Sequence, residues 1–313
     1  MRIAACNMRT HSGPLLEPPA QPFHKAGMKK TLFSFGHGYS ARALANILLA
    51  DGWTIYGTTR THEKCEPLRA EGIIPILWPG QDVTNALAQS DHLLISTAPD
   101  DNGDPVLNAA AREIAAAGSL EWIGYLSTTG VYGDHQGGWV DEATDLAPTT
   151  KRGVARVKAE AAWADFCKKQ SLSLHIFRLA GIYGPGRGPF AKVRNGTARR
   201  VIKPGQVFSR THVDDIAQVL AASIARPNPG GIYNVCDDDP APPQDVIAYA
   251  AELLGLPVPE PIDWDHADLS PMARSFYGES KKVRNDRIKS ELGVVLKYPD
   301  YKSGLNALLK QDS

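Results

Sequence analysis

The sequence contains little cysteine, and the cysteines that it has are scattered. The four among its 313 residues are Cys6, Cys65, Cys167 and Cys236, with no C-x-x-C pair and no Cys/His ligand spacing. A disulfide framework and a structural zinc site both need cysteines in close sets, so we expect no disulfide scaffold and no metal. Free thiols suit a reducing compartment, and we expect a cytoplasmic location.

The sequence also lacks an excess of either charge and any long apolar run. Its 34 basic and 34 acidic side chains give a formal net charge of zero. Nucleic-acid partners usually require a basic surplus, so we expect none. No apolar stretch approaches the ~20 residues of a membrane span, so we expect no membrane contact. The predicted partner is a small-molecule substrate, and a homodimer is left open.

The beginning of the chain differs in composition from the rest. Residues 1–27 are proline-rich and have no apolar periodicity, so we interpret them as a disordered leader. They contain no apolar core of roughly 7–15 residues, which a signal peptide would need. We expect a nucleotide-binding domain over residues 28–186. A smaller substrate lobe should follow over residues 187–313, partly woven back into the first domain.

The first periodic stretch of the chain predicts a strand, a glycine turn, a helix and a second strand. Thr31 to Phe35 is an apolar run typical of a buried strand, and helical spacing of apolar residues begins after Ser40. Between them lies Gly36-x-Gly38-x-x-Ala41, placed as in a dinucleotide-binding unit. A helix N-terminus offers unpaired amides and partial positive charge to a diphosphate. The residues expected at this cofactor turn are Gly36, Gly38, Tyr39, Ser40 and Ala41.

The end of the second strand indicates which nicotinamide cofactor is preferred. An NAD site usually carries a carboxylate there, bonded to the ribose 2′-hydroxyl. This chain has Thr59 and Arg60 instead, and a guanidinium attracts a 2′-phosphate. We therefore predict NADP, with NAD as the alternative. A solvated loop arginine is the other interpretation of Arg60.

Further strands and helices alternate along the chain. The predicted strands are 72–78, 92–97, 122–127, 172–180 and 231–235, and the predicted helices include 105–117, 150–169, a helix ending at Ala225 and 243–254. Ligands of open α/β sheets lie beyond the carboxyl ends of strands. Ser96, Thr97 and Ala98 are therefore expected at the cofactor wall, with a plain turn as the rival interpretation.

Several motifs in order carry a resemblance to a known family. They are Gly36-x-Gly38-x-x-Ala41, Leu126-Ser-Thr-Thr-Gly-Val-Tyr-Gly133, Arg178-Leu-Ala-Gly-Ile-Tyr-Gly-Pro-Gly186, His212-Val-Asp-Asp-Ile-Ala217 and Tyr233-Asn-Val235. The chain resembles the extended and atypical short-chain dehydrogenase/reductases, the NAD(P)-dependent epimerase/dehydratase group. The resemblance implies an α/β Rossmann fold: a doubly wound parallel sheet with helices on both faces and a small C-terminal substrate lobe. It also implies substrates such as nucleotide sugars.

The family's catalytic residues are only partly present. The resemblance places Thr128 at the Ser/Thr position that hydrogen-bonds the substrate oxygen. The family's lysine stands four residues before a glutamate, here Glu160, and that position holds Arg156. The tyrosine position four residues earlier holds Arg152. Arginine keeps its proton at physiological pH and cannot exchange it. Arg156 is expected at the cofactor ribose, and the rival interpretation is a surface pair between Arg156 and Glu160.

Other residues are candidates for the missing proton and for substrate contacts. Tyr132 is the phenol nearest to Thr128 in sequence and is a catalytic candidate, although it is more often structural in this family. The resemblance places Tyr183, Arg210 and His212 beside the substrate pocket. His212 titrates near neutrality, but a structural histidine is the alternative.

Two functions follow from these patterns. The first is an NADP-dependent oxidoreductase or epimerase acting on a sugar-like substrate. The second is a non-catalytic NADP(H)-binding or redox-sensing protein, suggested by a cofactor turn beside a lost Tyr–Lys pair. The fold is common to both functions, so it does not distinguish them.

Overall fold

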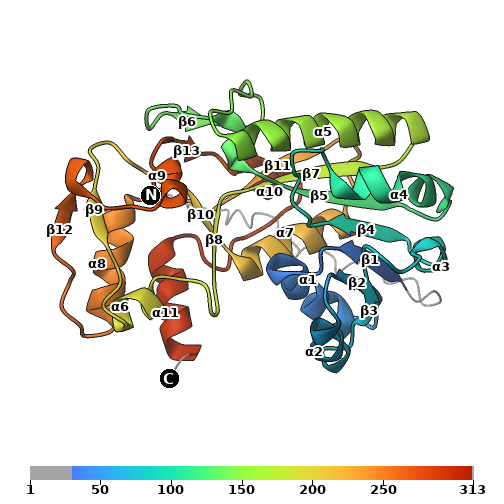
Figure 1. Cartoon of the computed structure of the whole chain (residues 1–313), viewed down its shortest axis with the longest axis horizontal. Helices are drawn as coiled ribbons and strands as arrows, with labels where there is room; N and C mark the ends of the chain where they lie inside the picture. Colours follow the sequence, from blue (N-terminus) through green and yellow to red (C-terminus); the bar gives the residue numbers. More distant parts are fainter. Residues whose placement is uncertain (1–29, 312–313) are drawn as a thin grey trace, which may run out of the picture.

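Seven strands form a central sheet in which every pairing is parallel, in the order β11-β7-β5-β4-β1-β2-β3 (Figure 1). The computed structural model describes residues 30–311. The strands are β1 Thr31–Phe35, β2 Thr54–Thr59, β3 Ile74–Leu77, β4 His92–Ile95, β5 Trp122–Thr128, β7 Leu174–Leu179 and β11 Ile232–Val235. The strand order reverses between β1 and β4, as in other doubly wound sheets. The predicted fold class is confirmed.

Helices cover both faces of the sheet. Helices α1 (Tyr39–Ala50) and α7 (Val213–Ala225) pack on one face with α2 (Cys65–Ala70) and α10 (Asp286–Ser290). On the other face lie α3 (Thr84–Ala88), α4 (Pro105–Ala116) and α5 (Lys151–Gln170) (Figure 1). The sheet is buried on both faces, which explains why its strands read as continuous apolar runs.

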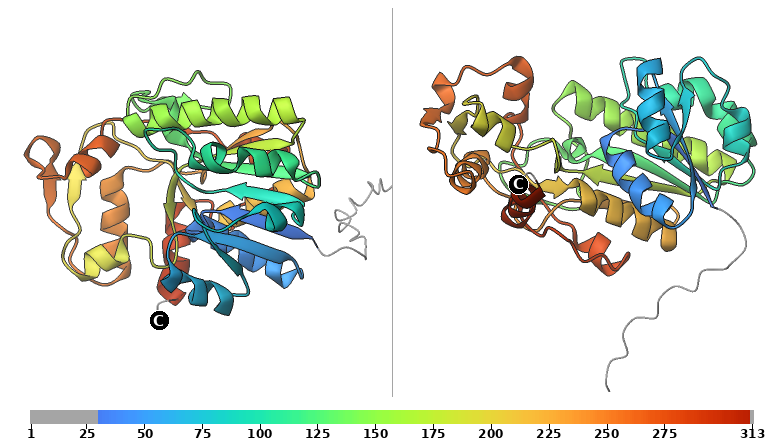
Figure 2. Two further views of the ribbon diagram at one scale, coloured as in Figure 1. Left: turned by 45° about the vertical axis from the view of Figure 1, so that its right-hand side comes forward. Right: turned by 90° about the horizontal axis from the view of Figure 1, so that it is seen from below.

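The later part of the chain builds a lobe with its own core and also returns to the sheet. Figure 2 shows this lobe beside the sheet. Its elements are α6 Phe190–Arg194, β9 Arg200–Ile202, α8 Pro243–Leu253, β12 Pro261–Asp263, η3 Trp264–His266, α9 Pro271–Phe276 and α11 Tyr301–Gln311. Phe190, Ala250 and Leu305 belong to its apolar core. Because α7 and β11 belong to the sheet domain, the chain crosses between the two parts more than once.

Short elements join the two parts. Strand β8 (Gly181–Tyr183) pairs with β10 (Arg210–His212), and β6 (Trp139–Val140) pairs with β13 (Lys282–Val283). The turns η1 (His62–Lys64) and η2 (Thr129–Tyr132) follow β2 and β5. These pairings bring residues after 280 next to the loop that follows β5. The proposed domain boundaries at residues 28–186 and 187–313 stay a prediction.

Some sequence predictions need comment. Helix α7 is not capped by either of the two aspartates in its first turn, Asp214 and Asp215. Its N-cap is His212, whose Nδ1 accepts a hydrogen bond from the Asp214 amide at 3.1 Å. The predicted leader, residues 1–27, lies outside the described residues. None of the helices between residues 30 and 311 is long and apolar enough to span a membrane. In the same range, no three His, Cys, Asp or Glu side chains are grouped to bind a metal ion.

Two buried histidines give the fold a predictable pH dependence. His92 and His175 are 2% and 0% exposed, and they flank Trp122 with ring centroids 6.3 and 5.7 Å away. Burial lowers the pKa of each from 6.5 to about 4, with Lys30 adding to the effect at His92. Between these pH values the unfolded chain binds protons that the folded chain excludes, so acid favours unfolding.

We expect the free energy of unfolding to fall by about 1.4 kcal/mol per pH unit for each of these histidines as the pH drops from 6.5 towards 4. Urea titrations across this range measure the slope. His175→Gln should flatten it by about one histidine's share, whereas His266→Gln, at an exposed side chain, should leave it unchanged. Equal slopes in wild type and His175→Gln would contradict the prediction.

Candidate functional site

A cavity of about 1100 Å³ opens at the carboxyl-end edge of the sheet, between the sheet and the lobe. The turn after β1 and the segments after β4 and β5 form its sheet side. The first turns of α5 line it as well, and residues from both β8–β10 and the lobe complete it. Strands far apart in the sequence meet here because parallel strands end on one edge.

The glycine turn after β1 is built to receive an anion. The Gly36 amide donates to Thr58 Oγ1 at 2.7 Å, which ties the turn to β2. Gly36 has φ +73°, and a Cβ there would lie 2.9 Å from Thr97 Cγ2. Gly38 is the N-cap of α1, and no side chain caps that helix. The first amides of α1 therefore keep free hydrogen bonds for a ligand.

The other residues predicted at the cofactor turn and wall differ in whether they line the cavity. Tyr39 and Ser40 line the cavity with the two glycines, and Ala41 is fully buried in the first turn of α1. Ser96 and Ala98 also line it. Thr97 is not among the described lining residues, and its carbonyl accepts a hydrogen bond from Arg156. The lining thus includes most of the predicted cofactor wall. A turn with free amides, small residues and a deep cavity fits a dinucleotide diphosphate.

Thr59 and Arg60 lie apart from this cavity. Thr59 is buried at the end of β2, and Arg60 is exposed just beyond it. Neither is among the described residues that line the cavity. Their expected contact with a 2′-phosphate therefore stays a prediction.

Arg156 is held at the ends of two strands. Its Nη1 donates to the carbonyls of Leu126 at 2.8 Å and Thr97 at 3.3 Å, and to Tyr125 Oη at 2.9 Å. These contacts place the guanidinium on the cavity wall between β4 and β5. The alternative of a surface pair with Glu160 is wrong, because Glu160 is buried and bonded to another arginine. The contact with a cofactor ribose that the resemblance implies for Arg156 stays a prediction.

Glu160 belongs to a buried ionic cluster. Arg178 Nη2 donates to Glu160 Oε2 at 2.8 Å, and the two side chains are 4% and 6% exposed. Arg178 Nη1 also donates to Tyr132 Oη at 2.9 Å, and that hydroxyl donates to Asn234 Oδ1 at 2.7 Å. Tyr132 is fully buried and absent from the cavity lining. The catalytic role predicted for Tyr132 is therefore wrong, because its hydroxyl accepts one hydrogen bond and donates another inside the core.

Thr128 and Arg152 face the cavity together. Thr128 ends β5, and its Oγ1 accepts from the Gly130 amide at 3.2 Å, which leaves the hydroxyl proton available. The Arg152 guanidinium lies 4.8 Å from the ring centroid of Phe276. The structure therefore brings Thr128, Arg152 and Arg156 to one wall.

The three residues predicted at the substrate side have different positions. Tyr183 and Arg210 line the cavity. Arg210 Nη1 donates to the carbonyls of Phe208 at 2.8 Å and Ala241 at 2.9 Å. His212 is 1% exposed and lies outside the described lining. Its Nδ1 caps α7 and its pKa is lowered to about 4, chiefly by burial. The predicted substrate contact of His212 is therefore wrong.

Sequence reasoning missed several residues that complete the cavity, namely Arg187, Lys192, Tyr277, Glu279 and Lys281. They come from irregular segments whose positions depend on tertiary packing, and we find no sequence signal for them. Of the lining residues in the described part of the chain, Glu279 alone has a carboxylate, against several cations. Such a charge balance attracts an anionic ligand.

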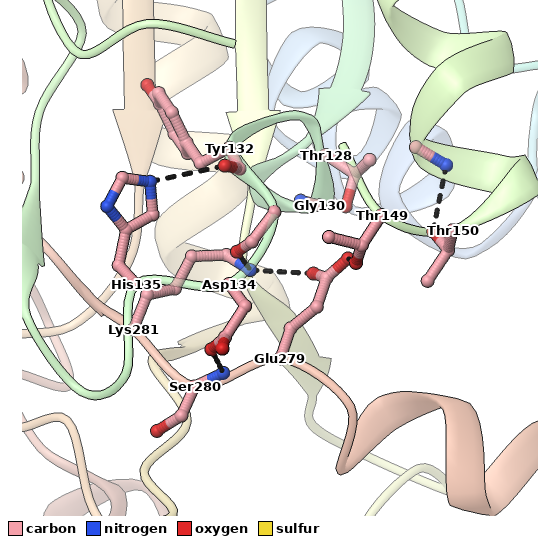
Figure 3. A network of polar contacts seen from close by, with 12 residues as sticks. Thr128, Gly130, Tyr132, Asp134, His135, Thr149, Thr150, Glu279, Ser280 and Lys281 are labelled. Atoms are coloured by element: carbon pink, nitrogen blue, oxygen red, sulfur yellow. Dashed lines mark hydrogen bonds and ion pairs between the residues drawn. The ribbon is translucent and has the colours of Figure 1, made fainter. Parts of the chain in front are cut away.

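Two of these missed residues form a network with the loop after β5 (Figure 3). Lys281 Nζ donates to the Gly133 carbonyl at 2.6 Å and to Glu279 Oε2 at 2.7 Å. Glu279 Oε1 accepts from Thr149 Oγ1 at 2.6 Å. The Ser280 amide between them donates to Asp134 Oδ1 at 2.8 Å. Several hydrogen bonds to the loop after β5 thus hold the ion pair between Lys281 and Glu279 in place.

Variants at Gly38 and Gly36 distinguish an effect on dinucleotide binding from an effect on folding. A Cβ on Gly38 meets nothing closer than the Gly36 carbonyl at 3.7 Å, so the fold tolerates Gly38→Ala. The added methyl group would occupy the approach of a diphosphate to α1. We expect dinucleotide affinity to fall at least ~10-fold, about 1.4 kcal/mol, with an unchanged melting temperature. Calorimetric titration with NADPH measures the affinity. Gly36→Ala, at positive φ, should lower both affinity and stability, and full affinity in Gly38→Ala would contradict the prediction.

The comparisons with known proteins agree with this geometry. Protein YeeZ of Escherichia coli (strain K12) is 32% identical over 288 residues, which cover 87% of this chain and 97% of that protein. The structure of a functionally unknown conserved protein from Silicibacter pomeroyi DSS is 62% identical, with TM-score 0.86 over 91% of this chain and 100% of that one.

A more distant structure shares the fold alone. The UDP-glucuronic acid 4-epimerase from Bacillus cereus in complex with NAD is 16% identical, with TM-score 0.72, and the match covers 90% of this chain and 99% of that one. The model of the NAD dependent epimerase/dehydratase family matches residues 36–236. That match spans the glycine turn, Thr128, Arg156 and β11. The chain therefore belongs to the NAD dependent epimerase/dehydratase family.

Proposed function

We propose that this protein is an NAD(P)-dependent oxidoreductase or epimerase that acts on a nucleotide-sugar-like substrate and prefers NADP. The observation that carries the proposal is the uncapped N-terminus of α1 at a cavity that continues past Thr128 to cationic residues near the lobe. Structures of similar fold include MoeE5 in complex with UDP-glucose and NAD. Its ligands are a dinucleotide and a sugar nucleotide, the pair of ligands that we propose here.

Several described residues fit a dinucleotide. Gly36 and Gly38 would leave room for its diphosphate at the first amides of α1, and Ser96 and Ala98 would lie along its nicotinamide half. All three of these hydrogen bonds of Arg156 are made by Nη1, so its remaining N–H groups would be available for ribose hydroxyls. When bound, the nicotinamide supplies or accepts a hydride. The chain's own residues then have to orient the substrate and handle its proton.

The substrate half of the cavity suits an anionic ligand. Thr128 offers a hydroxyl proton to a substrate oxygen at the reacting end. Arg187, Lys192 and Arg210 lie on the same cavity and are cationic. Guanidinium groups bind phosphate oxygens in fork geometry. A sugar joined to a nucleoside diphosphate satisfies both ends: hydroxyls near Thr128 and phosphates near the cations.

The preference for NADP rests on the end of β2. The strand ends at Thr59 and is followed by Arg60, without a carboxylate at either position, and Arg60 is exposed. A ribose 2′-phosphate would be repelled by a carboxylate and attracted by this guanidinium.

Arg60→Gln tests the cofactor preference. We expect the dissociation constant for NADPH to rise about 10-fold, since one charge-assisted contact of about 1.4 kcal/mol is lost. The value for NADH should stay within about 2-fold, because NADH lacks the phosphate. Arg69→Gln, a change at another exposed arginine, is the matched control. If wild-type protein binds NADH more tightly than NADPH, the NADP preference is refuted.

A non-catalytic, redox-sensing NADP(H) binder is the second candidate. It is favoured by one observation: the two helix positions that carry the family's Tyr and Lys hold Arg152 and Arg156, which retain their protons. Such a protein would bind the cofactor at the same turn but convert no substrate.

Thr128→Val distinguishes the two functions. Wild-type protein is incubated with NADP⁺ or NADPH and with UDP-glucose or UDP-glucuronic acid, and nicotinamide absorbance and sugar products are followed. If the protein is an enzyme, we expect turnover that falls at least ~100-fold in Thr128→Val, because the substrate oxygen loses its donor. Cofactor affinity should not change. Tight cofactor binding without turnover of any sugar nucleotide would favour the binder.

A further inference from the structure

The cavity needs a residue that can exchange a proton, and the family's tyrosine is missing. Arg152 and Arg156 keep their protons, and Tyr132 is enclosed in the core. Among the titratable lining residues, Tyr39 donates its hydroxyl to the Pro185 carbonyl at 3.0 Å. Tyr183 donates to the Asp300 carbonyl at 3.4 Å. Each of these two phenols thus already uses its only proton in a bond to the protein.

We propose that Lys281 is the catalytic residue that exchanges the proton with the substrate oxygen, and that Glu279 is its positioning residue. The inference rests on the proposed function and names the residue that would replace the family's tyrosine. It rests on the place of Lys281 in the cavity lining, on its hydrogen bond to the turn that begins at Thr128, and on the contacts that hold its segment.

The ammonium of Lys281 has one donor left for a ligand. A lysine ammonium carries three N–H groups. Two of them are used, on the Gly133 carbonyl at 2.6 Å and on Glu279 Oε2 at 2.7 Å. The described structure gives no third partner, and Lys281 lines the cavity. Its side chain is only 10% exposed, so a substrate oxygen would meet it in a space largely shielded from water.

Lys281 is tied to the same turn as Thr128. The short helix η2 has Thr128 as its N-cap and Gly133 as its C-cap. Lys281 Nζ bonds the carbonyl of that C-cap residue, so both side chains are anchored to one turn. Figure 3 shows the Glu279 carboxylate between the Thr149 hydroxyl and Lys281, on the side of the turn that carries Thr128 and Gly130.

The segment that carries the pair is held from both sides. The Ser280 amide donates to Asp134 Oδ1 at 2.8 Å, and the His135 amide donates to the Ser280 carbonyl at 3.1 Å. Directly after it, β13 pairs with β6. A site residue needs such support to stay in a productive position. Glu279 adds a counter-charge that keeps the ammonium in place.

In the direction of reduction, the substrate receives one hydride and one proton. The substrate carbonyl carbon receives a hydride from a reduced nicotinamide dinucleotide, and the C=O π pair moves onto oxygen. That oxygen takes a proton from Lys281 Nζ: an N–H bond breaks, an O–H bond forms, and the lysine is left as a neutral amine. The substrate is reduced, the dinucleotide is oxidised, and water returns a proton to Nζ. In the direction of oxidation the neutral amine accepts the hydroxyl proton.

The test compares Lys281→Arg and Lys281→Met with two control variants. Arginine keeps the charge and the donors toward Gly133 and Glu279 but does not release a proton. We expect Lys281→Arg to fold and to bind NADPH within about 2-fold of wild type. Its turnover of UDP-glucuronic acid should fall at least ~100-fold. Tyr277→Phe changes another titratable group on the same cavity, and Lys282→Met changes the neighbouring lysine, which lies outside the described lining. Both variants should keep turnover within about 5-fold. Lys281→Met should match Lys281→Arg in turnover.

Glu279→Gln tests the positioning role. Without the carboxylate the ammonium loses its counter-charge and releases its proton more readily. In the oxidation of UDP-glucuronic acid with NADP⁺, where Lys281 acts as the neutral amine, the acidic limb of the pH profile of kcat/KM should therefore move to lower pH. A merely structural glutamate would lower stability without moving that limb.

A binding measurement separates this proposal from the proposed function. In ¹⁵N-lysine-labelled protein, the Nζ signal of Lys281 is assigned by its absence in Lys281→Arg. It should shift when UDP-glucuronic acid is added with NADP⁺. Loss of the proposed function would show as no turnover by wild type, and a shifting Nζ signal would still support the contact. Three results would each overturn the assignment. They are turnover near the wild-type value in Lys281→Arg, a greater loss of turnover in Tyr277→Phe than in Lys281→Arg, and an Nζ signal that does not shift.

Discussion

Parallel pairing of the strands is the constraint on which the site depends. All strands of the sheet run the same way, so β1, β4 and β5 deliver their carboxyl ends to one edge. The glycine turn, the Arg156 anchor and Thr128 meet there for that reason alone. Reversing any one of these strands would send its terminal residues to the opposite edge. The helices follow from the same constraint, because parallel strands need crossovers that bury both faces.

A buried ion pair then fixes how α5 presents its side chains. Glu160 of α5 and Arg178 of β7 are nearly excluded from water, and each would be costly to leave without the other. Their contact sets the rotation of α5 on the sheet. Arg152 and Arg156, two and one turns earlier, are thereby directed to the cavity wall. The same pair orients Tyr132 inward, so one ionic contact decides which neighbouring groups reach the ligand.

Sequence patterns predicted the sheet and the glycine turn after β1 because both are encoded locally. A strand buried on both faces reads as an apolar run, and glycine spacing marks the turn directly. The roles of Tyr132 and His212 could not be predicted in this way, because a motif gives a position but not the direction of a side chain. His212 turned out to cap α7. Glu279 and Lys281 had no signal at all, since an irregular segment brings them to the cavity by tertiary packing.

Arg152 and Arg156 stand where the resemblance expects a tyrosine and a lysine, and this bears on what each wall of the cavity is able to do. On the α5 wall, fixed positive charge can bind phosphate or hydroxyl oxygens but cannot carry a proton. In the mechanism that we propose, proton exchange falls to Lys281, which the C-terminal part of the chain brings to the cavity. Its bond to Gly133 and the Ser280–Asp134 contact join that part to the loop after β5. The contact between these two parts is therefore a component of the site itself.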